Sequence, residues 1–350
     1  MAGVPDASAV ATVSAVHAQA RPRMALPNDR FTLLEIAFWL LPVIAFFAFP
    51  NYRVLGSQVL ITGLFAVSLD LILGYAGIVS LGHAAFFGIG AYAAGLLAVH
   101  GWHEPISGLL VAAIAAAIAG YLASFLVVRG GDLTRLMVTL GLGLMLWEAA
   151  NKAAFVTGGV DGLSGVTIAP ILGLFRFDIG GRTAFVYALV VVFVVFVIVR
   201  RIVHSPFGLS VRGIREGGKR MPAIGAPVAK RLRTIFTIGA AVAGIAGALI
   251  AQTTQFVGID TLGFPRSAEL LIMLVLGGAG RLYGGLVGAA IFIIAQDYLS
   301  GIDPVYWEFW IGFFLVLIVL FAKGGILGGL ETLRARFGPR GSGARSGVRE

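Results

Sequence analysis

The chain has 350 residues, of which 58% are hydrophobic and only 12% are charged, and its formal net charge is +9. A soluble domain carries about 25% charged residues because its surface must be solvated. This composition therefore excludes an ordinary water-soluble protein and favours one that uses the bilayer as its solvent. The sequence has no cysteine, which excludes disulfides, thiolate metal sites and cysteine nucleophiles. The basic residues lie between and after apolar runs, so they indicate orientation in a membrane, and no nucleic-acid partner is expected.

The N-terminal residues 1–32 are rich in Ala, Val and Ser and contain several arginines near their end. The sequence AQA at 18–20 resembles a signal-peptidase site. However, no basic region precedes it, and Asp6 and His17 interrupt the stretch before it. We therefore expect residues 1–32 to be a disordered cytoplasmic tail.

Apolar runs long enough to cross a bilayer, which takes about 20 residues, follow one another along the rest of the chain. The clearest runs lie at 33–49, 54–73, 106–128, 183–199, 234–257 and 306–322. The run 133–155 carries charges near its ends, and the regions 74–98 and 268–299 are interrupted by glycine. We predict an all-α, polytopic integral membrane protein with glycine-broken segments.

The basic residues predict which ends of these helices face the cytoplasm, because Lys and Arg are enriched in short cytoplasmic loops. The loop 200–233 holds nine basic residues against a single acid, Glu216. The tail 323–350 is also basic, so this tail and residues 1–32 are expected on the cytoplasmic side together with the loop. The segment 156–182, rich in turn formers, is then the largest external segment.

The number of crossings follows from these anchors. Six spans lead from the N-terminal tail to the loop 200–233, and an even number must lead from that loop to the C-terminal tail. Region 268–299 meets this requirement if it crosses twice, turning at 278–285. That gives a transmembrane domain over residues 33–322 with about ten helices. A re-entrant hairpin in the same place would change the count.

The first glycine-broken segment, GYAGIVSLGHAAFFGIGAYAAG, covers residues 74–95, and a second lies at 275–293. Each glycine costs about 1 kcal/mol relative to Ala in a helix interior. Non-helical backbone is tolerated at membrane depth only where protein or a water-filled cavity satisfies it, so broken helices are where solute pathways are built. The candidate residues of a translocation path in the two segments are Gly74, Tyr75, Gly77, Gly82, His83, Gly277 and Gly278. The alternative, close helix packing through small residues, stays open.

Several ionisable residues fall inside these spans or at their edges, and two of them, His83 and Asp70, bear on function or on helix orientation. His83 is a functional candidate because an ionisable group within a membrane is expensive. A neutral imidazole can also donate to a nearby carbonyl and simply hold two helices together. Asp70 lies at the cytoplasmic end of its span, where we expect a hydrated carboxylate that anchors the helix at the interface.

The sequence indicates no catalytic chemistry. It contains no metal-ligand cluster, no nucleophile with a base and an orienting acid at a recognisable spacing, and no GxxxxGK[ST] phosphate loop. We expect no catalytic residue, no metal and no cofactor on this chain. Any ATP hydrolysis must then belong to another subunit.

The stretch SPFGLSVRGIREGGKRMPAIGAPV at 205–228 is more strongly patterned than a passive loop requires. Val211, Ile214 and Arg215 give a short helical face, which Gly217 and the glycine and prolines after it interrupt. A short helix between two spans could dock a partner at the cytoplasmic surface. The alternative is a basic loop that serves only topology or contact with anionic lipid.

Four stretches of the chain, taken in order, carry a family resemblance. They are GYAGIVSLGHAAFFGIGAYAA at 74–94, MVTLGLGLML at 137–146 with TGGVDGL at 157–163, SPFGLSVRGIRE at 205–216 with Gly225, and LLIMLVLGGAGRLYGGLVGAA at 270–290. Together they resemble the LivM-type permeases of branched-chain amino-acid ABC importers, over about residues 54–330.

This resemblance implies a multi-pass permease subunit in a bacterial inner membrane, with both termini in the cytoplasm. Such permeases lie in membrane lipid and pair with a second permease of the LivH type, two cytoplasmic ATPase subunits that bind ATP, and a periplasmic substrate-binding protein. Asp161 and Gly162, in the external segment, are then candidate contacts for the binding protein.

The resemblance also implies that residues 205–228 seat in a groove on the ATPase. The residues that match the family's coupling segment by position are Ser205, Pro206, Phe207, Gly208, Arg215, Glu216 and Gly225. Residues 217–222 depart from the family pattern, because GGKRMP stands where an acidic, alanine-rich helix is usual. Two glycines and a proline should shorten the coupling helix.

The cargo implied by the resemblance is a branched-chain, aliphatic amino acid, moved by alternating access. Related permeases move urea, short amides or other small organic solutes, and this alternative stays open because the binding protein does most of the selection. A stand-alone channel or an ion-coupled carrier is more remote. Ion-coupled carriers usually bury charged groups along the path, which are sparse here, and a channel has no need of the loop at 205–228.

Overall fold

The computed structural model describes residues 33–170, 175, 177–178, 180–218, 220–304, 306–321, 325–326 and 328. Within these ranges the named elements are all helices, and one isolated β-bridge joins Leu163 to Val257. The all-α architecture predicted from the sequence is confirmed for this part of the chain. The tail predicted at 1–32, and nearly all of the one at 323–350, lie outside the described residues.

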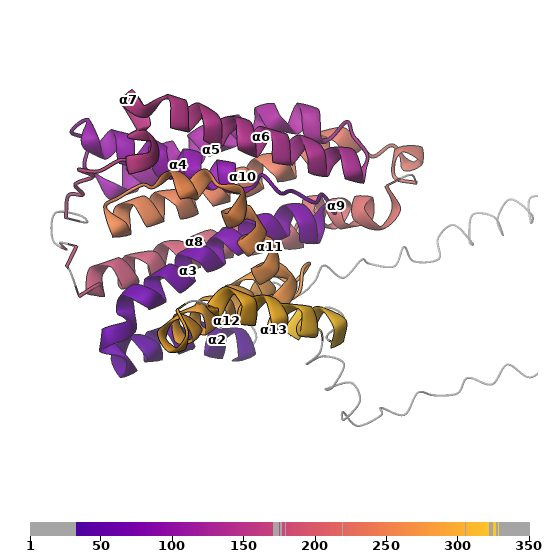
Figure 1. The fold of residues 1–350 in the computed structure, drawn as a ribbon. Helices are drawn as coiled ribbons and strands as arrows, with labels where there is room; N and C mark the ends of the chain where they lie inside the picture. Colours follow the sequence, from indigo (N-terminus) through magenta and orange to yellow (C-terminus); the bar gives the residue numbers. More distant parts are fainter. Residues whose placement is uncertain are drawn as a thin grey trace, which may run out of the picture.

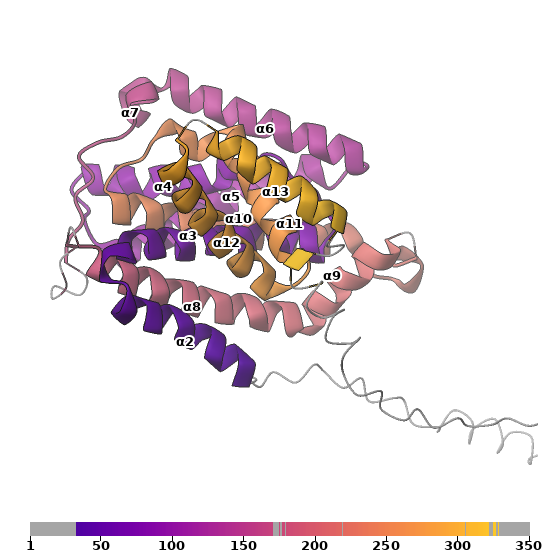
Figure 2. The same cartoon turned by 60° about the horizontal axis from the view of Figure 1, so that its bottom comes forward.

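The helices of the bundle differ in length, and two of the shortest helices lie at its ends. The bundle consists of α2 (Leu33–Ala48), α3 (Arg53–Asp70), α4 (Ala84–Val99), α5 (Pro105–Val127), α6 (Asp132–Lys152), α8 (Arg182–His204), α10 (Val228–Thr254), α11 (Phe264–Gly277), α12 (Leu282–Ile302) and α13 (Trp307–Phe321). The short helices α7 (Ala154–Thr157) and α9 (Pro206–Gly217) lie at opposite ends of the bundle (Figure 1). Turned by 60°, the bundle has α6 at one edge and α2 at the other (Figure 2).

Each predicted apolar run overlaps one of these helices, and the region 268–299 overlaps two. α11 ends at Gly277 and α12 begins at Leu282, so the turn predicted within 278–285 occupies residues 278–281. Among the described residues, six helices are long and apolar enough to cross a membrane. α2, α4, α11 and α13 have 14 to 16 residues, fewer than a usual span. The chain is a multi-spanning helical protein, and the count of ten crossings stays a prediction.

α3 forms the centre of the bundle. Every residue from Leu60 to Asp70 is buried, and the helix contacts α8, α10, α11 and α12. A helix that is covered on all sides needs apolar or small residues around its whole circumference. The sequence LITGLFAVSLD supplies them, apart from two hydroxyl groups and the carboxyl group of Asp70.

α10 packs against α4 and α5 through small residues. A Cβ on Gly90 of α4 would clash with the backbone of Gly244, and a Cβ on Gly244 would clash with Ala116 of α5. In lipid, where helix association gains little from the hydrophobic effect, such close approach provides the van der Waals contact that holds helices together. Close packing therefore accounts for the helical part of the first glycine-broken segment.

The end of α8 departs from the sequence prediction. The loop predicted at 200–233 is helical at both ends, because α8 continues to His204 and α10 begins at Val228. Arg200 is only 6% exposed, and its Nη2 lies 3.1 Å from Oε2 of Glu35 on α2. A charge attributed to the cytoplasmic loop is thus part of a buried ion pair that joins α8 to α2.

Replacing Glu35 by Gln should destabilise the protein by about 3–5 kcal/mol, because Arg200 would remain buried without its counter-charge. Thermal unfolding of the purified protein in detergent measures this loss as a lower midpoint. The double replacement Glu35→Gln with Arg200→Met removes both charges and should recover most of the stability.

The matched control for this prediction is Lys152→Gln. Lys152 pairs with Glu148 at 3.6 Å, but both side chains are largely exposed, and exposed pairs contribute about 0–1 kcal/mol. The control should therefore unfold at nearly the wild-type temperature. An equal loss in both variants would contradict burial as the cause.

Candidate functional site

The short helix predicted within residues 205–228 forms and is α9, and its coupling role stays a prediction. Ser205 is its N-cap: the hydroxyl oxygen accepts a hydrogen bond from the N–H of Gly208 (3.4 Å), and Pro206 occupies the first turn. The helix ends at Gly217, at the start of the stretch that the sequence predicted would shorten it. Gly208 lies so close to the carbonyl of Val203 that a Cβ would clash with it. Because glycine has no Cβ, the chain can turn sharply between α8 and α9.

One face of α9 is buried against the bundle and the other is exposed. Val211 and Ile214 are buried and belong to the main hydrophobic core. Pro206 and Glu216 are exposed, as is Gly225 in the turn that follows the helix. α9 is therefore docked on the bundle, and only its outer face is accessible.

Two arginines of α9 hold the broken end of α3. α3 continues as a π-helical segment, Leu71–Tyr75, after which the chain leaves the helix. Nη1 of Arg215 donates a short hydrogen bond to the carbonyl of Gly74, and the guanidinium of Arg212 lies 4.7 Å from the centre of the Tyr75 ring. Arg215 remains exposed while Nη1 makes this bond, so its predicted contact with the ATPase stays a prediction.

The second glycine-broken segment meets the first at the same place. The N–H of Gly280, in the turn between α11 and α12, donates a hydrogen bond of 2.6 Å to Oδ1 of Asp70. Gly280 has φ +84°, and a Cβ on it would lie 3.1 Å from Nη1 of Arg215. Asp70 is 0% exposed. The expectation of a hydrated interfacial anchor is therefore wrong, because the turn at 278–281 folds over the carboxylate.

These contacts join three segments that are far apart in the sequence into one cluster, named here the α9 junction. Its members are Asp70, Gly74, Tyr75, Arg212, Arg215 and Gly280. A buried carboxylate needs hydrogen bonds and opposite charge, and both arginines lie close enough to attract that of Asp70. The α9 junction therefore brings α9 into contact with both helix breaks.

The other glycines singled out by the sequence lie where the backbone is crowded or turns. A Cβ on Gly82 would clash with a carbonyl of α6, and one on Gly277 would clash with a carbonyl of α12. Gly77 (φ +72°) and Gly278 (φ +107°) adopt backbone conformations that favour glycine. Packing and turn geometry account for these four positions, and their place in a translocation path stays a prediction.

His83 joins the start of α4 to α3. It is 0% exposed, its Nε2 lies 2.8 Å from the hydroxyl of Ser68, and its ring stacks on Phe65. The next residue, Ala84, donates its N–H to the hydroxyl of Ser267 on α11 (2.9 Å). This geometry matches the helix-bridging alternative for His83. The two bonds join the start of α4 to the last turn of α3 and to the start of α11.

The candidate contacts for a binding protein lie at the other end of the molecule. Asp161 is exposed in the short turn Gly159–Asp161, which follows α7 at the end of the bundle opposite α9 (Figure 1). Gly162 is buried, has φ +73° and precedes Leu163, whose backbone pairs with Val257. Asp161 is accessible and Gly162 shapes the turn, and their contact with a binding protein stays a prediction.

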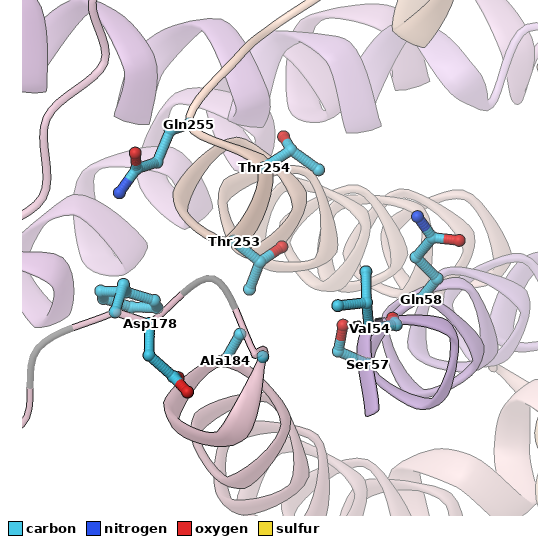
Figure 3. Close-up of a pocket in the computed structure, with 10 residues that line it drawn as sticks. Val54, Ser57, Gln58, Asp178, Ala184, Thr253, Thr254 and Gln255 are labelled. Carbon is cyan, nitrogen blue, oxygen red and sulfur yellow. Dashed lines mark hydrogen bonds between the residues drawn. The ribbon is translucent and has the colours of Figure 1, made fainter. Parts of the chain in front are cut away.

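A polar cavity of about 250 Å³ lies among the start of α3, the start of α8 and the end of α10 (Figure 3). Its polar lining residues are Ser57, Gln58, Asp178, Thr253, Thr254 and Gln255. Oδ1 of Asp178 also accepts a hydrogen bond from the N–H of Thr183 (3.1 Å), so the carboxylate caps the start of α8. The sequence pattern did not predict this cavity, because each segment contributes only one to three polar residues.

Comparison with known proteins decides the family. A family model described as the permease component of branched-chain amino acid transport systems matches residues 53–322. The chain belongs to this family. No solved structure matches the chain.

Individual relatives agree with the family. The permease protein LivM of a high-affinity branched-chain amino acid transport system of Escherichia coli K12 is 28% identical over 288 residues, 75% of this chain and 66% of that protein. LivM of Salmonella typhimurium is 27% identical over 334 residues, 87% of this chain and 78% of that protein. LivH of Escherichia coli K12 is 30% identical over 128 residues, 36% of this chain and 41% of that protein. The chain thus spans just under two thirds of the length of the Escherichia coli LivM protein.

Replacing Gly82 by Leu should abolish solute uptake, because the new side chain would displace α6 from the start of α4. Overpacking of this kind costs about 1–3 kcal/mol or more. Uptake of radiolabelled leucine, a test solute taken from the family description, by cells that express this permease measures the effect, with the amount of protein in the membrane determined in parallel.

The matched control is Gly141→Leu on α6, where an added Cβ meets no atom within 4 Å. This variant should transport normally. Wild-type uptake by Gly82→Leu would contradict the tight approach of α4 to α6.

Proposed function

We propose that this chain is one of two permease subunits of an ATP-driven importer for branched-chain, aliphatic amino acids. Family membership supports the permease role, and similarity to both LivM and LivH proteins supports a pair of related permeases. ATP is hydrolysed on two separate cytoplasmic ATPase subunits, and a periplasmic binding protein delivers the amino acid. α9 and both ends of the chain lie in the cytoplasm, and α7 lies outside the bacterial inner membrane.

The single observation that carries this proposal is the docking of α9. A moving ATPase subunit must press on a part of the permease that is both accessible and firmly joined to the membrane helices. The outer face of α9 carries Pro206 and Glu216, which are exposed. Its inner face is anchored by Val211 and Ile214, which are buried. A docked helix of this kind can pass on a rigid-body movement.

The candidate coupling residues then divide into two groups. Exposed candidates form the surface that an ATPase subunit would contact: Pro206, Arg215, Glu216 and Gly225. Other candidates hold α9 in place. Ser205 caps the helix, Phe207 lies under the guanidinium of Arg231, and Gly208 permits the tight turn from α8. Arg215 belongs to both groups, because it also bonds the carbonyl of Gly74.

The α9 junction links α9, whose outer face an ATPase subunit would contact, to the membrane helices. Arg215 bonds Gly74 at the end of α3 and lies beside Gly280 between α11 and α12. Broken helices can bend where their hydrogen-bond ladder is interrupted, and such breaks mark the moving parts of transporters. A displacement of α9 would therefore tilt α3 and the α11–α12 pair together, which is the movement that alternating access needs.

An ion-coupled carrier fits this geometry less well, because it draws its energy from an ion gradient and needs no docked α9 to receive force from another subunit. A stand-alone channel has no use for a docked α9. Urea and short amides remain alternative cargoes for a permease of the same kind, and they are included as substrates in the transport experiment.

Reconstitution into liposomes tests the proposed energy source. Vesicles that contain this chain, its companion permease, the ATPase subunits and the binding protein should accumulate leucine, isoleucine or valine against a gradient when ATP is supplied. Vesicles without the ATPase subunits should not. Uphill uptake by the two permeases alone would contradict the proposal, and accumulation of urea or an amide in place of leucine would contradict the proposed cargo.

Replacing Arg215 by Ala should uncouple the complex, because Gly74 would lose its charged hydrogen-bond donor on α9. Hydrogen bonds to charged groups contribute about 1.5–3 kcal/mol, so we expect substrate-stimulated ATPase activity to fall about tenfold while expression is unchanged. The number of leucine molecules imported per ATP hydrolysed should also fall.

The control for this variant is Arg220→Ala, a change at an exposed arginine three residues beyond the end of α9. It removes the same charge from the same loop and leaves the α9 junction intact. Equal coupling in the Arg215 and Arg220 variants would contradict a specific role of Arg215.

A further inference from the structure

A second cavity lies beside the start of α11. Its volume is about 580 Å³, and it is open on one side, among α4, α6, α10 and the turn η5 (Ile259–Leu262) that precedes α11. Leu144 and Trp147 of α6 line it. At 1.5 Å per residue they lie about 18–22 Å from the start of that helix and about 8–12 Å from its end, so the cavity lies in the half of the bundle nearer α7. Sites for small molecules have volumes of about 300–1,000 Å³, and this cavity falls in that range.

Charged groups of both signs line the cavity. Arg266 and Glu269, in the first two turns of α11, form an ion pair with Nη1 and Oε2 3.1 Å apart. Asp260 of η5 lines the same cavity. The guanidinium of Arg266 also lies 6.0 Å from the centre of the Phe87 ring, which keeps it against the wall. Each side chain of the ion pair is 34% exposed, so a ligand in the cavity could reach both charges.

The rest of the wall is largely apolar. Phe87, Leu144, Trp147, Ile250 and Phe264 contribute side chains from four different helices. The cavity thus combines one positive group, two negative groups and a hydrocarbon surface. A free aliphatic amino acid has the complementary parts, since it carries one carboxylate, one ammonium group and a branched hydrocarbon chain.

Folding alone gives little reason for this ion pair. Charged side chains within a membrane protein are unfavourable unless they serve a function, and a partly exposed pair contributes about 0–1 kcal/mol to stability. The chain has a second pair with the same spacing and distance, Arg135 with Asp132 at 3.1 Å. That pair lies in the first turn of α6, where the side chain of Asp132 is 86% exposed.

We propose that this cavity binds the transported amino acid inside the permease. Arg266 holds the α-carboxylate, Glu269 and Asp260 hold the α-ammonium group, and the apolar wall holds the aliphatic side chain. The inference rests on the proposed function and adds a substrate site to it. Binding exchanges the Arg266–Glu269 pair for two pairs with the ligand, and Arg can bind a carboxylate in a bidentate manner, so neither charge is left alone.

The test measures binding to the membrane complex of both permeases and both ATPase subunits, purified without the binding protein. The detergent contains no zwitterionic lipid. The probes are leucine, leucinamide, which lacks the carboxylate, and 4-methylpentanoate, which lacks the ammonium group. The wild type should prefer leucine to either analogue by about tenfold or more. Arg266→Gln should lose the preference over leucinamide, and Glu269→Gln should lose the preference over 4-methylpentanoate.

The ratio of two affinities within one variant is insensitive to a general loss of folded protein, so it separates recognition from stability. Arg135→Gln is the matched control and should keep both preferences. Unchanged preferences in Arg266→Gln, or no saturable binding of leucine to the wild type, would overturn the site. If the site is overturned but the complete importer still shows normal ATP-driven uptake of leucine, the proposed function stands without this substrate site. Absence of such uptake in the wild type would overturn both.

Discussion

A backbone polar group that is released inside a membrane must find its partner within the protein, because lipid offers none. This chain interrupts its helices at 76–83 and at 278–281. At the α9 junction, the guanidinium of Arg215 donates a hydrogen bond to the carbonyl of Gly74, and the carboxylate of Asp70 accepts one from the N–H of Gly280. The breaks that give a transporter its bending points are stable here because side chains from elsewhere in the chain complete their hydrogen bonds.

The same constraint gives the arginines of the basic loop a second role. Their charge is of the kind that orients membrane proteins, yet Arg212 and Arg215 also hold the end of α3, and Arg200 pairs with Glu35. A residue that serves topology can therefore be fixed in place by a structural contact. Side-chain contacts therefore fix several positions of a loop that is rich in positive charge.

Two helices connect the coupling end of the molecule with its cavities. α3 begins at the polar cavity near α8 and α10 and ends in the α9 junction. α11 begins at the cavity that contains Arg266 and ends at the turn that contains Gly280. At 1.5 Å per residue, α11 covers about 21 Å, and it crosses the bundle obliquely (Figure 1). Tight packing of α10 on α4 and α5 provides the fixed frame against which α3 and α11 could move.

Sequence alone determined the helical, multi-spanning class, the division of region 268–299 into two helices and the presence of α9, because hydrophobicity, glycine breaks and helix caps are local properties of the chain. It assigned Asp70 to water, whereas the folded chain buries Asp70 and places its carboxylate on the N–H of Gly280, 210 positions away. It also gave no sign that Arg215 bonds the carbonyl of Gly74, 141 positions away, because such pairings arise only when the chain folds. Only folding also brings Asp260, Arg266 and Glu269 together with the apolar residues of three other helices in one cavity, since no local pattern records which helices become neighbours.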